Sequence, residues 1–425
     1  MKVLASVIFA VGITFAAMAE SSAANVGMIE VRSSITPVVE AYISRAISVA
    51  ERQNDACLII QLDTPGGLMD STSKIVQSIY ESQVPIVVYV SPAPARAAIA
   101  GTYITMAADV AVMAPYTRIG AAHPVGMNGE GETNSIEWTK VENDTASFAR
   151  SIADKRGRNA VWAEAAARQS VSLTAEEALS SNVVDFIAKD VPDLLRQLDG
   201  REVHDQTLKT ADAKVVAIPM TMRETFLQLF LRPEVMFVLM LVVIYGIIGE
   251  LTSPGAILPG VVGAIAIILV LCLSAVLPIN VAGLALIALS VVLFIIDVYT
   301  PTHGVLTGGG IVAFFLGALM LFNRANPAFH LPLSYVIGGT AVTACFFLFV
   351  VGAGLRAQRL PVQTGREMML GQITPAAGRI DSSGGKVFVE GEWWNAVSET
   401  PVENGESVEI IGIDGLTLKV KRKQG

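Results

Sequence analysis

The sequence predicts an α/β domain, then a multi-span α-helical membrane region and then a small all-β barrel. The 425 residues are 52% hydrophobic and 16% charged, whereas a soluble globular protein has about 25% charged residues. Residues 25–230 contain both apolar and charged residues, as a soluble protein does. Residues 233–355 carry almost no charge, and residues 363–425 are polar again. This distribution indicates two water-soluble domains joined by a membrane region, and it excludes an ordinary soluble enzyme. The net charge of −8 argues against a nucleic-acid partner, because phosphate binding needs a basic face.

Residues 1–24 have the organisation of a secretory signal peptide. Lys2 precedes a short apolar stretch, and Ala17-Met18-Ala19 fits a small-x-small cleavage site, with a later cut near Ala23 or Ala24 as an alternative. An uncleaved anchor helix is the other interpretation, although the apolar run is short for a span. Both interpretations predict that the following domain is exported.

The cysteines are not placed to form a disulfide, and the histidines are not spaced to bind a metal ion. The three cysteines are Cys57, Cys272 and Cys345, so the exported domain has no pair for a disulfide, and each is expected to be a small buried apolar residue. The histidines do not have metal-ligand spacing. They are His123, His204, His303 and His330. We therefore expect no metal and no cofactor.

Residues 25–212 alternate β-rich runs with helical patterns, which is typical of an α/β domain with crossover connections. Strands are predicted over 57–62, 85–90 and 110–113. Helices are predicted over 68–82, 95–106 and 141–156. The first strand ends in Asp63-Thr-Pro-Gly-Gly67, and a loop is expected over 114–124.

Residues 213–232 are predicted to be an interfacial linker, in which 225–233 form a helix that delivers the chain to the bilayer. Five apolar runs then predict about five spans, since roughly 20 helical residues cross the hydrocarbon. The runs are 235–251, 257–277, 281–297, 305–322 and 333–355. An exported start and an odd number of spans place the C-terminus in the cytoplasm of a multi-pass inner-membrane protein.

The membrane region contains an internal repeat. Ile248-Gly-Glu-Leu-Thr-Ser-Pro254 recurs as Ile296-Asp-Val-Tyr-Thr-Pro301, which puts Glu250 and Asp297 in equivalent places at the ends of runs. Such carboxylates can mark a transport path. We favour helix-end groups in headgroup water, because both lie at run boundaries.

Residues 366–425 contain five short strand patterns separated by turns, which predicts a small closed barrel. Trp393 and Trp394 are adjacent, so on a strand they point to opposite faces. The segment has no basic stripe, which favours a structural or protein-docking barrel over one that binds single-stranded nucleic acid.

Several motifs in the α/β domain resemble those of long-form NfeD proteins, a family similar to the ClpP/crotonase group of membrane-associated serine endopeptidases. They occur at 63–69, 97–104, 113–115, 119–122, 157–160 and 173–179. The likeness continues through the membrane region and the final domain, so it covers nearly the whole mature chain. It implies a ClpP/crotonase-like domain over 25–212 and an OB-fold domain over 363–425.

The resemblance implies a Ser–Lys dyad, in which a desolvated lysine deprotonates a serine and backbone N–H groups hold the oxyanion. Gly66 and Gly67 match the oxyanion position, and Lys140 matches the family's lysine as general base. Ile99 stands where the family has its nucleophilic serine. An isoleucine has neither a proton to give nor a lone pair to attack with, so we expect a pseudoprotease or scaffold.

Two alternatives remain open at this point. Ser91 or Thr102 could serve as a displaced nucleophile, although a misplacement of about 1 Å already costs about 10²-fold in rate. Lys140 is either a cleft lysine or a solvated residue before a helix. The family further implies a stomatin/SPFH-type membrane partner, and the fold implies homo-oligomers in contact with membrane lipid.

Overall fold

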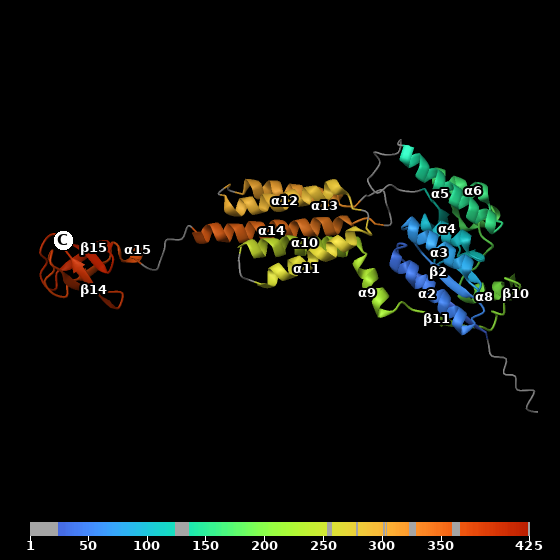
Figure 1. Ribbon diagram of the computed structural model, residues 1–425, viewed down its shortest axis with the longest axis horizontal. Coiled ribbons are helices and arrows are strands. Elements are labelled where there is room, and N and C mark those ends of the chain that lie inside the picture. Colours follow the sequence, from blue (N-terminus) through green and yellow to red (C-terminus); the bar gives the residue numbers. More distant parts are fainter. Residues whose placement is uncertain are drawn as a thin grey trace, which may run out of the picture. The chain divides into compact units, whose positions relative to one another are not determined.

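The computed structural model describes residues 24–123, 136–252, 257–277, 279–300, 302, 304–322, 329–358 and 366–423. The predicted signal peptide lies almost wholly outside these residues. The described chain comprises an α/β domain, a group of apolar helices and a β-barrel (Figure 1), which confirms the predicted fold class.

The α/β domain is built on a six-stranded sheet in the order β11-β1-β2-β3-β5-β8. Every neighbouring pair is parallel, as the predicted crossovers require. The strands are β1 (Asn25–Val31), β2 (Leu58–Leu62), β3 (Ile86–Val90), β5 (Val110–Met113), β8 (Phe186–Ile187) and β11 (Lys214–Ala217). Because β11 pairs along β1, the sheet extends past residue 212 into the predicted linker.

Helices cover both faces of the sheet, which explains why β2 and β3 are buried along their whole length. One face packs against α2 (Pro37–Gln53), α3 (Met69–Glu81), α4 (Ala100–Ala107) and α5 (Ile136–Lys155). The other packs against α8 (Val191–Leu198), through Leu194, Leu195 and Leu198. The remaining elements are α6 (Ala160–Gln169), α7 (Ala175–Ser180), β9 (Glu202–Val203) and β10 (Gln206–Thr207).

A second, three-stranded sheet corrects the prediction of one long helix over 95–106. It consists of β4 (Arg96–Ala98), β6 (Arg118–Gly120) and β7 (Ser172–Thr174). Ala97 pairs with Ile119 and also forms a bridge to Thr64. These pairings hold the alanines extended, so tertiary contacts override their helix propensity. The helix expected from 141 also begins five residues earlier, at Ile136.

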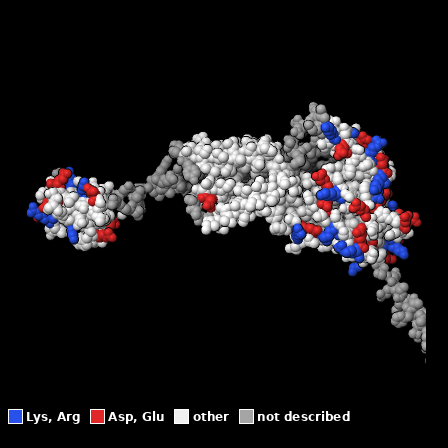
Figure 2. All heavy atoms as spheres, in the orientation of Figure 1, with Lys and Arg blue, Asp and Glu red and all other residues white. Residues whose placement is uncertain are grey.

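Each of the five apolar runs forms a helix, and α9 (Met222–Phe230) precedes them. They are α10 (Pro233–Thr252), α11 (Ile257–Ser274), α12 (Val281–Tyr299), α13 (Val305–Met320) and α14 (Leu333–Gln358). Two of them, over Pro233–Leu251 and Ile257–Ser274, are long and apolar enough to cross a membrane, while the apolar parts of the other three are shorter. Charged side chains almost disappear over these helices (Figure 2).

The helices pair as two glycine-packed hairpins, α10 with α11 and α12 with α13. A Cβ on Gly246 would lie 2.6 Å from the Cα atom of Gly263, and a Cβ on Gly317 would lie 2.8 Å from the carbonyl oxygen of Gly283. Only glycine permits backbones to approach this closely, which is a common way for membrane helices to associate.

The internal repeat has a structural counterpart in these hairpins. Asp297 accepts hydrogen bonds from Thr302 and from Thr307, the latter at 2.5 Å. A Cβ on Gly260 would lie 2.5 Å from Oε2 of Glu250. In both hairpins the carboxylate therefore reaches the residue ten positions later (307 − 297 and 260 − 250), at the start of the next helix.

The C-terminal domain is a five-stranded all-β barrel in the order β12-β15-β16-β14-β13. A bridge between Ala376 and Val387 joins the two edges and nearly closes it, as expected for an OB-fold. The strands are β12 (Ile373–Pro375), β13 (Gly385–Val389), β14 (Glu392–Val397), β15 (Ser407–Asp414) and β16 (Thr417–Arg422), preceded by the short helix α15 (Arg366–Met369). Trp393 is exposed and Trp394 packs against the barrel core, which confirms that they point to opposite faces.

Candidate active site

The Pro-Gly-Gly segment after β2 is held by backbone hydrogen bonds to Ile35. The Ile35 N–H donates to the Gly66 carbonyl at 2.8 Å, and the Leu68 N–H donates to the Ile35 carbonyl at 2.9 Å. In this parallel bridge the N–H of Gly67 points to the opposite side. A Cβ on Gly67 would lie 2.3 Å from the Ile35 carbonyl oxygen, so the close approach requires glycine.

The two predicted oxyanion glycines differ in whether their backbone N–H groups are already hydrogen-bonded within the protein. The Gly66 N–H donates to Oγ1 of Thr64 at 3.2 Å, so it is already satisfied. The Gly67 N–H has no acceptor among the residues that the structure describes. Gly67 is therefore the better candidate to hold a developing negative charge or a bound carbonyl group.

Ile99 lies at the turn between β4 and α4 with φ 47° and ψ −106°. This conformation is that of the first central residue of a type II′ turn, where glycine dominates, and it is strained for a β-branched side chain. Backbone hydrogen bonds fix it: the Ile99 N–H donates to Gly120, and its carbonyl accepts from Thr102. A strained strand-to-helix turn of this kind is how several hydrolases present a nucleophile.

Ile99 and the glycine segment meet in one cleft of about 520 Å³. A Cβ on Gly66 would lie 2.9 Å from Cδ1 of Ile99, and both Gly67 and Ile99 line the cleft. Most of the other lining side chains are apolar or small. All the other lining residues are Pro37, Leu68, Met69, Asp70, Ser71, Thr72, Lys74, Ala100, Tyr103, Ala122, Val141, Thr145, Ala275 and Val276.

Lys140 lies inside α5, not before a helix as expected, and its side chain is exposed. The next residue, Val141, lines the cleft together with Thr145, one turn further along. Lys140 itself is not among the described residues of the lining. Lys140 therefore precedes a lining residue on α5 but does not itself line the cleft together with Ile99.

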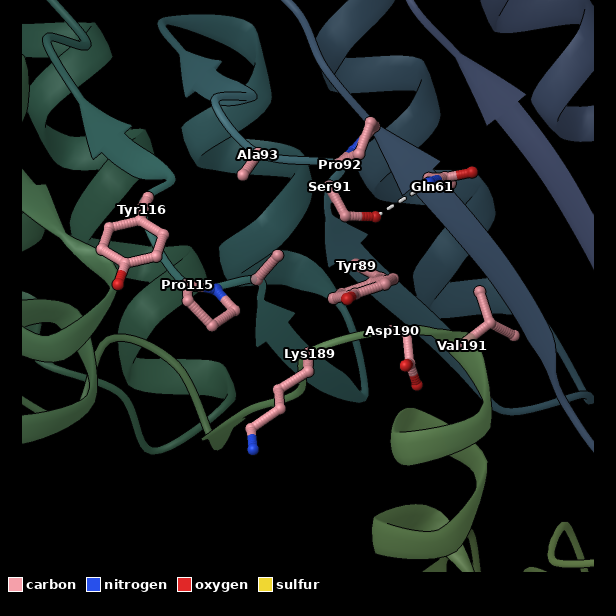
Figure 3. Close-up of a pocket in the computed structure, with 11 residues that line it drawn as sticks. Gln61, Tyr89, Ser91, Pro92, Ala93, Pro115, Tyr116, Lys189, Asp190 and Val191 are labelled. Carbon is pink, nitrogen blue, oxygen red and sulfur yellow. Dashed lines mark hydrogen bonds between the residues drawn. The ribbon is translucent and has the colours of Figure 1, made fainter.

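Thr102 is buried and its hydroxyl donates to the carbonyl oxygens of Ala97 and Gly120, at 2.9 and 3.2 Å. Ser91 lies in a different pocket, at the carboxyl ends of β2 and β3 (Figure 3). There its hydroxyl accepts a hydrogen bond from Nε2 of Gln61 at 2.9 Å. Neither hydroxyl lines the cleft of Ile99, so the geometry gives no support to either as a displaced nucleophile.

Sequence reasoning missed the polar side chains of the cleft, among which Ser71 and Lys74 lie on α3. Ser71 is 4% exposed and belongs to the core-facing side of α3, together with Ile75 and Ile79. Ser71 and Lys74 are three residues apart, which puts both on one face of α3, but ordinary packed residues have the same spacing, so the pattern did not single them out. Lys74 is exposed.

His123, His204 and Cys57 are held by structural partners or by burial, whereas His330, Cys272 and Cys345 are exposed, so the expectation that each cysteine is buried is wrong for Cys272 and Cys345. His123 Nδ1 lies 2.8 Å from the Ala167 carbonyl oxygen, and His204 Nε2 lies 2.9 Å from Oδ1 of the buried Asp109. Cys57 is buried, which raises the pKa of its thiol to about 12. Within the described part of the chain no group of three or more His, Cys, Asp or Glu could hold a metal ion. His303 lies outside the described residues.

The fold and the cleft together define a membrane protein with a protease-type α/β domain and a C-terminal barrel. Three family models match it in this order: the N-terminal domain of NfeD1b over residues 25–205, the NfeD integral membrane domain over 234–353, and the NfeD-like C-terminal, partner-binding domain over 366–422. The chain belongs to the NfeD family, in its long form.

Two curated relatives cover nearly the whole chain. The membrane-bound protease PH1510 of Pyrococcus horikoshii is 33% identical over 414 residues, which is 93% of each chain. The membrane protein NfeD1b of Bacillus subtilis is 25% identical over 440 residues, covering 96% of this chain and 95% of the relative.

Solved structures of the 1510-N membrane-bound stomatin-specific protease are also similar. A serine-to-alanine mutant is 34% identical with a TM-score of 0.45, covering 47% of this chain and 100% of that one. A lysine-to-alanine mutant in complex with a substrate peptide is 32% identical with a TM-score of 0.45, covering 49% and 98%.

Proposed function

We propose that this chain is a pseudoprotease that binds an apolar segment of a stomatin/SPFH-type membrane protein in the Ile99 cleft and does not cleave it. The observation that carries the proposal is Ile99 itself. It has the strained conformation of a nucleophile turn, it meets Gly66 and Gly67, and its side chain has no atom that can attack a carbonyl.

The cleft retains features that suit binding. The Gly67 N–H is directed away from Ile35 and is available to a substrate carbonyl, in the way that an added strand pairs with a free edge. Side chains such as Leu68, Met69 and Val141 offer apolar contact. Such a cleft favours an extended apolar peptide, and the relative from Pyrococcus horikoshii is described as specific for a stomatin homologue.

Cleavage would need a nucleophile and a base that touch the same carbonyl. Without a hydroxyl at position 99 no acyl-enzyme can form there, and an exposed Lys140 has no proton to take. We therefore assign Lys140 to the place of the family's general base without a catalytic role in this chain.

A cleavage assay with four full-length forms tests the proposal: wild type, Lys140→Ala, Ile99→Ser and the Ile99→Ser/Lys140→Ala double variant. The substrate is an apolar peptide from the C-terminal stretch of a stomatin-type protein. We expect silence from wild type, activity from Ile99→Ser, and loss of that activity in the double variant. Wild-type cleavage above background would refute the pseudoprotease, and Ser71 would then be the first hydroxyl to mutate.

A binding assay separates a peptide-binding pseudoprotease from a scaffold with an idle cleft. Val141→Asp puts a charge into the cleft lining, and we expect it to weaken binding of the same peptide at least about tenfold. The matched control is Val161→Asp, because Val161 is also an exposed valine on a helix but lies outside the lining. Equal affinities for the two variants would contradict the proposed site.

We further propose a topology of about five spans with residues 1–24 as the signal peptide, the α/β domain exported and the barrel in the cytoplasm. Five apolar helices between the two domains support an odd number of crossings. The proposed assembly is a homo-oligomer in contact with lipid. Reporter fusions at Gly200 and at Gly425 test the orientation: opposite compartments are expected, and a shared compartment would overturn it.

A further inference from the structure

Helix α9 carries an unpartnered apolar face beside the start of the membrane domain. Met222, Phe226 and Leu229 are 88%, 60% and 46% exposed. Their i, i+4, i+7 spacing puts them on one side of the helix, and the Phe226 and Phe230 rings pack in a tilted arrangement with 4.8 Å between centroids. Exposed Arg223 and Arg232 flank this face.

The opposite side of α9 is docked on the α/β domain. Glu224 accepts two hydrogen bonds from the Arg45 guanidinium, at 2.7 and 2.8 Å. Gln228, one turn later, accepts from the Thr36 hydroxyl at 3.0 Å and donates to the Ser33 hydroxyl at 3.2 Å. A capping box formed by Thr221 and Glu224 fixes the beginning of the helix.

The segment that α9 holds is the one that supports the cleft. Ser33 and Thr36 flank Ile35, whose N–H and carbonyl hold the strand of Gly66 and Gly67, and the next residue, Pro37, lines the cleft. Gln228 is therefore hydrogen-bonded to Thr36, and Ile35, the residue before Thr36 in the chain, is hydrogen-bonded to the Pro-Gly-Gly loop.

We propose that the apolar face of α9 lies in the lipid headgroup region, and that α9 thereby anchors the Ser33–Pro37 segment and the Gly66–Gly67 loop at the membrane surface. Lipid is the occupant because only Leu231 and Arg232 separate α9 from α10, where the membrane domain begins. The aromatic rings and the two flanking arginines suit the boundary between acyl chains and headgroups. The proposal does not depend on peptide binding or on catalysis.

Spin-label accessibility in nanodiscs of phosphatidylcholine and phosphatidylglycerol tests the lipid contact. A nitroxide is attached to Phe226→Cys in the full chain with Cys272→Ala and Cys345→Ala, since Cys57 is buried and does not react. Oxygen concentrates in the bilayer and a nickel chelate stays in water. The ratio of oxygen to nickel accessibility is expected to exceed that of a label at Val161→Cys at least about fivefold. Val161 is a suitable control because it is 81% exposed and lies on α6.

Equal ratios at positions 226 and 161 would overturn the lipid contact. A label at Leu229→Cys repeats the measurement on the same face, so a local distortion at one position does not decide the result.

Hydrogen exchange tests the link to the cleft. Gln228→Ala should make the Ile35 and Leu68 amides exchange about tenfold faster, with the β3 amides unchanged as evidence of an intact domain. The matched control is Gln197→Ala, which removes a half-buried glutamine that donates to Ile187 and Asp193. Unchanged exchange at Ile35 and Leu68 in Gln228→Ala would overturn the link.

Discussion

The Cδ1 atom of Ile99 occupies the space directly above Gly66, 2.9 Å from the point where a Cβ on that glycine would lie. Both residues have a positive φ, 47° at Ile99 and 126° at Gly66. The two turns that build the cleft, one after β2 and one before α4, are therefore fitted to one another. An isoleucine is accommodated there because position 66 has no side chain.

This fit makes the stability cost of Gly66→Ala depend on Ile99. In wild type the new methyl group meets Ile99 and also adopts a conformation that L-residues avoid, so we expect a loss of about 2–4 kcal/mol. In an Ile99→Ser background the loss should be smaller by about 1 kcal/mol. Chemical denaturation of the four forms measures the difference, and additive losses would show that the two residues do not interact.

Thr102 is predicted to be a structural residue. Thr102→Val removes the buried hydroxyl that donates to the Ala97 and Gly120 carbonyls, which should destabilise the domain by about 1–3 kcal/mol. Thr102→Ser should restore most of that loss because it keeps the hydroxyl. If Thr102→Val left stability unchanged but removed a peptidase activity of the wild type, Thr102 would be a nucleophile after all.

The Arg45–Glu224 contact predicts a pH-dependent attachment of α9. Hydrogen bonds from Arg45 hold the pKa of the Glu224 carboxyl below its ordinary value of 4.5, against the opposing effect of burial. A lowered pKa in the folded protein means that the stabilisation is fully present above about pH 4.5 and is lost as the pH falls through the folded-state value. The protection of the α9 amides relative to their intrinsic exchange rates should therefore fall below that pH, and Glu224→Gln should remove this dependence.

The two adjacent tryptophans of the barrel should respond differently to truncation. Trp394→Ala removes a side chain that packs on the barrel core, and we expect a loss of about 2–3 kcal/mol. Trp393 is exposed and packs against Phe388 in a tilted arrangement with 5.1 Å between ring centroids, so Trp393→Ala should cost about 1 kcal/mol or less. Thermal unfolding of the full chain, followed by tryptophan fluorescence, compares them, and equal losses would contradict the assigned faces.

Local patterns predicted the elements that tertiary contacts reinforce, and they failed where such contacts compete. The strand over 110–113 and the helix over 68–82 agree with β5 and α3, since burial periodicity and propensity point the same way there. Residues 95–98 are alanine-rich but extended, because their backbone groups pair with β6 and with Thr64. Of the motif residues, Gly67 and Ile99 line one cleft and Gly66 contacts Ile99.

The exposure of Lys140 could not be predicted, because the covering of a side chain depends on residues distant in sequence. For the same reason the sequence did not reveal that Ser91 is separate from the cleft. Ser91 follows β3 and lies on a different side of the sheet from Ile99. Ser71 was missed because a serine within a core-facing stripe is indistinguishable by pattern from an ordinary packed residue.

The repeated carboxylates of the helical region bear on how the protein is made. Glu250 and Asp297 each contact the helix that immediately follows their own, at the same interval. Each pair of helices thus contains the surface against which its own acidic group packs as soon as both members have been synthesised. The region is suited to insertion two helices at a time, and removing one whole pair should disturb the remaining pair less than removing any single helix.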